Sequence, residues 1–216
     1  MRIIRSGGEA AIVRGGHRSS ASSTTDLELP ELRLDSVSSV TVRLSRTSRE
    51  AMRDEAFRLT GSDDRECGGF LLAPVARSWD RTVEITHATT TGNAIRRNGG
   101  MTMDTSRLSD AERWVERNGW HDEALAGIFH THPGEIGRDA GRPSDADLKA
   151  LLSIRDWAHK TRGACNSVGL ILTMGRAGSH YGAEYSWATP ELHAWLTRRT
   201  PTGTPVTEWA NVEGWR

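Results

Sequence analysis

Lysine, cysteine and long apolar runs are scarce in this sequence. Only Lys149 and Lys160 among the 28 basic residues are lysines, and 28 acidic residues bring the formal charge to zero. A chain without net charge has no overall field that attracts nucleic acid or an anionic membrane surface. We therefore expect no nucleic-acid partner and no membrane partner.

The two cysteines, Cys67 and Cys165, are too few to hold a chain of 216 residues together by disulfides. The first residues lack the basic start, apolar core and cleavage site of an export signal, and we find no apolar stretch near the length that crosses a bilayer. These absences favour a cytoplasmic protein. Cys67 is explained most simply as a small buried residue, which disfavours a cysteine-dependent hydrolase.

The chain length favours one domain. Residues 1–35 are rich in Gly, Ser, Arg and Thr and predict a flexible N-terminal tail. The domain itself is expected over residues 36–200. Residues 201–216, with Gly203 and Pro205, predict an extended C-terminal tail.

The apolar patterns predict an α/β domain around one sheet. Strands are expected at residues 40–44, 70–73, 83–85, 124–129, 168–172 and 183–187, with 83–85 pairing back on 70–73. Helices are expected at residues 47–61, 108–117, 144–159 and 190–195, the first opened by a capping box of Thr47 and Glu50 and ended by Gly61. Residues 89–102 indicate an irregular loop that borders a binding cleft.

Three residues in the second half of the chain predict a metal site. His130 and His132 are two apart on an expected strand, so both side chains point to the same side. Asp147 is the natural third ligand, because it lies in the first turn of the helix that Ser144 opens. Imidazole and carboxylate groups are common zinc ligands, and three protein ligands leave a fourth position open for catalysis.

Each part of this pattern also has a purely structural interpretation. A His-x-His pair is common on polar surfaces, and Ser144 followed by Asp147 three residues later is a helix N-terminal cap. The cap and the metal site do not exclude each other. It is the combination of the two elements that favours a metal site.

The sequence resembles a known metallopeptidase family. His130-Thr131-His132-Pro133, the later Ser144-x-x-Asp147 and Glu66 ahead of a Gly-Gly-Phe-Leu-Leu run look like the JAMM motif of the MPN or JAB family, as in bacterial JAB-domain proteins. The resemblance covers residues 40–195 and implies a mixed central sheet flanked by helices, of the cytidine-deaminase-like kind. It also implies one Zn²⁺ and these roles: Glu66 as general base, Ser144 as the residue that steadies the tetrahedral intermediate, and His130, His132 and Asp147 as zinc ligands.

One spacing departs from the family pattern. That pattern leaves ten residues between the second histidine and the aspartate, whereas residues 133–146 number fourteen here. The extra length falls in residues 134–142, whose glycines and charges suit a surface insertion, and loops tolerate such length at little entropic cost. Asp139 and Asp145 are therefore rivals to Asp147, and Glu135 is a rival to Glu66.

The resemblance implies a zinc-dependent peptidase or isopeptidase that hydrolyses the bond after the C-terminal glycine of a ubiquitin-like or sulfur-carrier-like protein. E1/E2-like conjugation proteins are the partners that such a reaction suggests. Two alternatives stay open. One is a zinc hydrolase that removes an amino-acid adduct from a sulfur-carrier protein or cuts a peptidoglycan peptide, and the other is a non-catalytic MPN scaffold for protein assembly or DNA processing.

Overall fold

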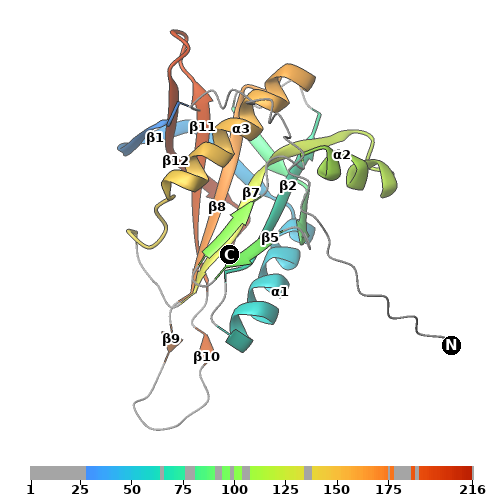
Figure 1. Cartoon of the computed structure of the whole chain (residues 1–216), viewed down its shortest axis with the longest axis vertical. Helices are drawn as coiled ribbons and strands as arrows, with labels where there is room; N and C mark the ends of the chain where they lie inside the picture. The colour runs from blue at the N-terminus through green and yellow to red at the C-terminus, as the bar shows by residue number, and fades with distance from the viewer. Residues whose placement is uncertain are drawn as a thin grey trace, which may run out of the picture.

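The chain folds around an eight-stranded sheet (Figure 1). The computed structural model describes residues 28–63, 66–75, 81–90, 94–97, 100–103, 108–133, 138–174, 176–177, 186–187 and 190–215. The helices are α1 (Arg46–Asp63), α2 (Leu108–Arg117) and α3 (Asp145–Arg162). The strands are β1 (Glu31–Leu44), β2 (Gly68–Pro74), β3 (Thr82–Ile85), β4 (His87–Thr90), β5 (Ala94–Arg97), β6 (Gly100–Met103), β7 (Glu123–Pro133), β8 (Asn166–Met174), β9 (Arg176–Ala177), β10 (Ser186–Trp187), β11 (Glu191–Arg199) and β12 (Pro205–Glu213).

The large sheet is mixed and nearly closed. Its strand order is β3-β1-β12-β11-β8-β7-β2-β4, with β1 parallel to β3 and β12, β7 parallel to β8, and the other pairs antiparallel. The two edge strands, β3 and β4, are separated in the chain by Thr86 alone. The Thr86 amide and hydroxyl both donate to the Leu72 carbonyl of β2, at 3.0 and 3.2 Å. The sheet must therefore curl until its edges come close together.

Helices α1 and α3 pack on opposite faces of this sheet. Phe129 of β7 belongs to the larger core cluster together with Met52 of α1. Its neighbour Ile128 belongs to a second cluster with Ile154 of α3, and Figure 1 shows α3 lying along β7 and β8. Burying such a side chain contributes about 1.5–3 kcal/mol. Even-numbered residues of this part of β7 therefore lie on the α3 face, which is the face that carries the candidate site.

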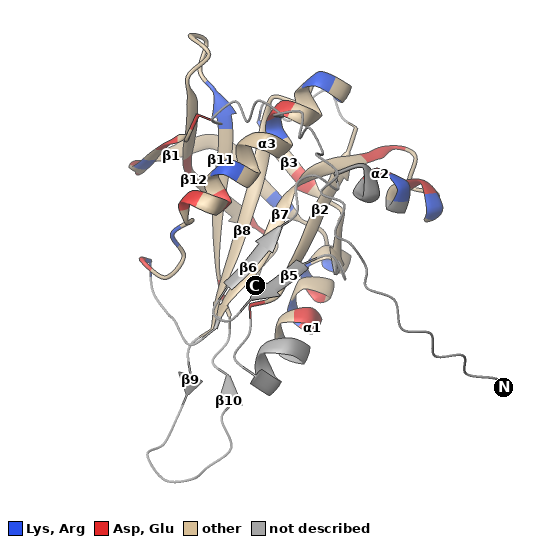
Figure 2. Cartoon of the chain, viewed as in Figure 1, with Lys and Arg blue, Asp and Glu red and all other residues tan. Residues whose placement is uncertain are grey.

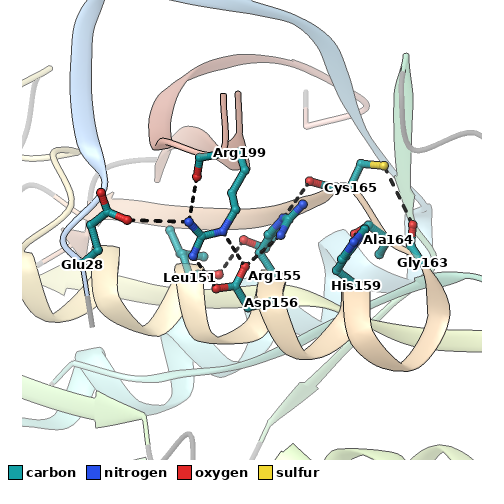
Figure 3. A network of polar contacts seen from close by, with 11 residues as sticks. Glu28, Leu151, Arg155, Asp156, His159, Gly163, Ala164, Cys165 and Arg199 are labelled. Atoms are coloured by element: carbon teal, nitrogen blue, oxygen red, sulfur yellow. Dashed lines mark hydrogen bonds and ion pairs between the residues drawn. The ribbon is translucent and has the colours of Figure 1, made fainter. Parts of the chain in front are cut away.

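Arg199 connects the middle of α3 to strand β11 and to the turn that follows this strand (Figure 3). Its Nη2 and Nε atoms donate to the two carboxylate oxygens of Asp156, at 2.7 and 3.0 Å, and its Nη1 donates to the Gly203 carbonyl at 2.8 Å. Arg155 adds a bond of 2.8 Å from its Nη1 to Asp156. The hydrogen bonds from Arg199, followed by the one from Arg155, lower the pKa of Asp156 below its ordinary value.

Both signs of charge occur on each of the three helices, as Figure 2 shows, in keeping with the balanced composition. Within the described parts of the chain, no helix combines the length and the apolar character that crossing a membrane requires.

Several sequence predictions are confirmed. The mixed sheet and the helices that pack on it make the described residues one mixed α/β domain. The strands at 40–44, 70–73, 124–129 and 168–172 lie within β1, β2, β7 and β8, and α2 covers residues 108–117 as expected. Helix α3 begins directly after Ser144, and its C-cap Gly163 has φ 71°.

The two predicted tails are wrong where the structure describes them. Strand β1 begins at Glu31, inside the expected N-terminal tail, while residues 1–27 lie outside the described residues. The expected C-terminal tail contains β12, which lies between β1 and β11 in the sheet. Gly203, with φ 87°, and Pro205 therefore belong to the turn and the strand start of a β11–β12 hairpin rather than to an extended tail.

Four local predictions also need correction. The helix expected at 190–195 is strand β11, because β8 and β12 on either side supply hydrogen-bonding partners for its backbone. Strand β3 pairs with β1, and it is β4 that pairs with β2. The loop expected at 89–102 contains the β5–β6 hairpin. Helix α1 begins after Ser45, whose Oγ accepts the Ser48 amide at 3.0 Å, and runs past Gly61. Of the strand expected at 183–187, only Ser186–Trp187 is described.

Candidate metal centre

Strand β7 presents the two histidines. It lies inside the sheet between β2 and β8, and His130 and His132 are opposite Ile171 and Thr173 of β8. Alternation along the strand places both imidazoles on one side, as the sequence predicts, and this side is the α3 face. Because hydrogen bonds to neighbouring strands hold β7 on both sides, the backbone under the two rings is rigidly placed.

The first turn of α3 presents Asp147. Ser144 is the N-cap, with φ −75° and ψ 168°, and its Oγ accepts the Asp147 amide at 3.3 Å. In return, the Ser144 amide and hydroxyl donate to Oδ2 of Asp147, at 2.8 and 2.7 Å. This reciprocal capping box fixes the carboxylate against the start of the helix, where the helix dipole also favours negative charge.

The three side chains converge on one point. Each of His130, His132 and Asp147 offers a ligand atom within 4.8 Å of the other two, so the group could hold a metal ion. The two Nε2 atoms are 3.0 Å apart, and Nε2 of His130 is 3.7 Å from Oδ2 of Asp147. Bonds of about 2.0–2.1 Å at tetrahedral angles place neighbouring ligands about 3.3 Å apart, so both separations suit such an ion.

Burial keeps the His130 imidazole in its metal-binding form. The side chain is 6% exposed, and burial is the main cause that lowers its pKa below the ordinary value. Asp147 acts in the opposite direction and His132 adds to the lowering. A neutral imidazole has a lone pair to offer a metal, whereas an imidazolium has none.

A backbone carbonyl orients the second ring. Nδ1 of His132 makes a short hydrogen bond with the carbonyl oxygen of Ala140. Since a carbonyl can only accept, Nδ1 carries the proton, and in the neutral ring the lone pair is on Nε2, which faces His130. This arrangement, in which the outer nitrogen of a ligand histidine is held by a carbonyl, is common at metal sites.

The sheet places Glu66 beside this centre. The Cys67 amide donates to Oγ1 of Thr131 at 2.9 Å, and the Thr131 amide donates to the Cys67 carbonyl at 2.8 Å. Since β2 and β7 are antiparallel, the residue before Cys67 lies opposite the residue after Thr131. Glu66 is therefore opposite His132 and half-buried, and its carboxylate is not part of the three-residue group.

The rival residues do not join this group. Asp145 is exposed at the start of α3, and Asp139 lines a pocket of about 180 Å³ together with Leu34 and Trp209. Glu135 lies outside the described residues, as does the rest of segment 134–137. Among the candidate carboxylates that the structure describes, Asp147 is the one that reaches the two histidines.

Four residues near the centre escaped the sequence reasoning. The Ala140 carbonyl accepts a hydrogen bond from His132. The next residue, Gly141, lies against the His193 ring, and its carbonyl accepts a hydrogen bond from the Trp195 indole. Nothing in the sequence pattern around His193 distinguishes it from a surface or packing residue. The pKa of His193 is lowered, first by burial, while Glu191 acts in the opposite direction and His132 adds to the lowering. No signal in the single sequence links residues 140 and 193.

No protein-family model matches the chain, and a search of curated proteins finds no match. The class that the fold and site define is therefore a mixed α/β domain with a group of two histidines and one aspartate that could hold a metal ion.

Proposed function

We propose that this protein is a zinc-dependent peptidase or isopeptidase that hydrolyses the bond after the C-terminal glycine of a ubiquitin-like or related carrier protein. The observation that carries the proposal is the convergence of His130, His132 and Asp147, with Glu66 opposite His132 in the sheet. The reaction class and substrate come from the resemblance of these residues to the JAMM motif. The residues that follow the order of the motif in the sequence also lie together in space, which supports the resemblance.

The residues present fit zinc. Two nitrogen ligands and one oxygen ligand, all at separations that suit tetrahedral coordination, are the set that catalytic zinc sites use. Bound there, zinc supplies a Lewis acid that polarises the scissile carbonyl and lowers the pKa of water to about 7. His130, His132 and Asp147 would hold the ion.

The other roles belong to side chains of the chain itself. Glu66 accepts a proton from the attacking water and passes it to the leaving amine, which requires a carboxylate within one hydrogen bond of both. In this proposal Ser144 stabilises the oxyanion, and its hydroxyl donates to Asp147 in the free protein. Rotation about one side-chain bond is needed before Ser144 can donate to substrate.

The test compares wild-type protein with Glu66→Gln, which keeps shape and removes the base. Both are loaded with zinc and given a carrier protein ending in Gly-Gly, extended by either a linear peptide bond or a lysine isopeptide bond. We expect equal zinc content and a rate about 10²–10⁴-fold lower in the variant, followed by mass spectrometry. Intact substrates with both proteins would reject the peptidase, and zinc binding without turnover would favour the scaffold alternative.

A further inference from the structure

The segment 138–144, between β7 and α3, is bound by side chains of the sheet. The Trp195 indole Nε1 donates to the Gly141 carbonyl at 2.7 Å, and Trp195 is fully buried in β11. The preceding peptide carries the Ala140 carbonyl that holds His132. Two consecutive carbonyls are therefore fixed, that of Gly141 by Trp195 of β11 and that of Ala140 by the candidate ligand His132.

Gly141 has no room for a side chain. A Cβ atom built there would be 2.1 Å from Cγ of His193 and 2.5 Å from its Nδ1, distances that carbon atoms do not tolerate. The φ angle of Gly141 is not among the positive glycine φ values that the described residues contain, so the restriction is one of space. The segment thus lies directly against the His193 ring.

His193 is itself held in place. Its Nε2 is 3.2 Å from Oγ1 of Thr173, a fully buried residue of β8. Thr173 is the register partner of His132 on β7 and of Glu191 on β11. The candidate ligand, Thr173 and His193 therefore belong to three adjacent strands, and the rigid sheet sets the distance between the ring of His193 and the ring of His132.

A second contact fixes the start of the segment. The Arg138 guanidinium lies 5.2 Å from the Trp209 ring centre and donates to the Leu34 carbonyl at 2.8 Å. Trp209 in turn stacks on Trp195 at 3.7 Å between ring centres. The segment is thus bound both before and after Ala140.

We propose that Gly141, His193 and Trp195 are positioning residues that press the Ala140 carbonyl onto Nδ1 of His132 and so hold this ligand in the tautomer whose Nε2 faces the metal. The inference rests on the proposed function, because it concerns the same metal site. Losing such an outer hydrogen bond typically lowers metal affinity 10–100-fold.

The first test uses Gly141→Ala. Its methyl group displaces the segment from His193, so we expect zinc affinity, measured by competition with a chelating dye, to fall 10–100-fold. In the metal-free protein, ¹⁵N chemical shifts of the His132 ring should change from the Nδ1–H tautomer to a mixture. The double variant Gly141→Ala with His193→Ala should recover part of both, because the atoms that clash with the new methyl group are gone while the supporting ring is lost as well.

Trp195→Phe keeps an aromatic ring and removes only the indole donor, so it should give a weaker shift in the same direction. Arg142→Ala is the matched control, since this residue is in the same segment and its side chain is exposed. It should keep wild-type affinity and tautomer. Circular dichroism confirms that each variant is folded.

Wild-type affinity and tautomer in both Gly141→Ala and Trp195→Phe would overturn the inference. So would equal losses in Gly141→Ala and the double variant, because then the effect does not run through His193. The proposed function fails separately: a wild-type protein that binds no zinc still reports its His132 tautomer, and one that binds zinc but hydrolyses nothing leaves the positioning role intact.

Discussion

Two aspartates on α3 have opposite surroundings. Asp156 receives two hydrogen bonds from Arg199 and one from Arg155, so guanidinium groups of the chain neutralise its charge. Asp147 receives bonds from the amide and hydroxyl of Ser144 and faces the His130 imidazole. Guanidinium groups cannot bind a metal, whereas imidazoles can. The comparison separates a structural carboxylate from a candidate ligand on one helix.

The two aspartates also differ in where their hydrogen-bond partners lie in the chain. Asp156 binds across to β11 and, through Arg199, to the turn at Gly203, so its contacts connect distant segments (Figure 3). The bonds of Asp147 are local and orient one carboxylate toward two side chains on β7. The first arrangement stabilises the fold, and the second prepares a site.

Replacing the candidate ligands should have the largest effect. Asp147→Asn and His130→Ala each remove one of three ligands, so we expect zinc content after dialysis to fall from about one equivalent to near zero. Asp156→Asn is the matched control on the same helix and should keep its zinc. Elemental analysis of the three proteins decides this, and zinc retained by Asp147→Asn would mean that another group holds the metal.

Ser144→Ala should have an intermediate effect, which lowers both the stability of the fold and the affinity for zinc. It removes the cap acceptor and one donor to Asp147, so we expect a loss of about 1 kcal/mol in the free energy of unfolding and about tenfold in zinc affinity. Ser153→Ala, whose hydroxyl donates to the Lys149 carbonyl within the same helix, serves as control and should change stability by less than about 0.5 kcal/mol. Urea unfolding and dye competition measure the two effects, and equal behaviour of both variants would contradict the capping role.

Asp156→Asn should have the smallest effect, confined to stability. Its carboxylate is partly exposed, so we expect a cost of about 1 kcal/mol, or about 2–4 °C in Tm for a chain of this size. The folded-state pKa of Asp156 is lowered, so its contribution is complete above the ordinary pKa near 4 and is lost as the pH falls through the lower value.

Calorimetry at several pH values checks the Asp156 prediction. The Tm difference between wild type and Asp156→Asn should be constant from about pH 5 to 7 and should shrink below about pH 4. A difference that grows as the pH falls would show that Arg199 does not stabilise the charged form.

Local patterns in the sequence predicted the parts of the site that neighbouring residues determine. The alternation of β7 places His130 and His132 together, and the cap at Ser144 places Asp147 in the first turn of α3. Both features depend on contacts within a few residues. The same holds for the strands β2 and β8 and for helix α2.

What the sequence did not predict depends on residues far apart in the chain. Strand β11 was expected to be a helix because its pairing with β8 and β12 cannot be read from its own residues. Strand β12 was missed because Gly203 and Pro205 are equally typical of a tail and of a hairpin turn. The Ala140 carbonyl and His193 are connected to the site only through the folded sheet.

The central claim is that His130, His132 and Asp147 bind one metal ion. Anomalous diffraction at the zinc absorption edge, from crystals of this chain grown with one equivalent of zinc, tests it most directly. The account predicts one strong peak bonded to Nε2 of both histidines and to a carboxylate oxygen of Asp147, at about 2.0–2.2 Å. A peak bound by other residues, or no peak between these three side chains, would contradict it.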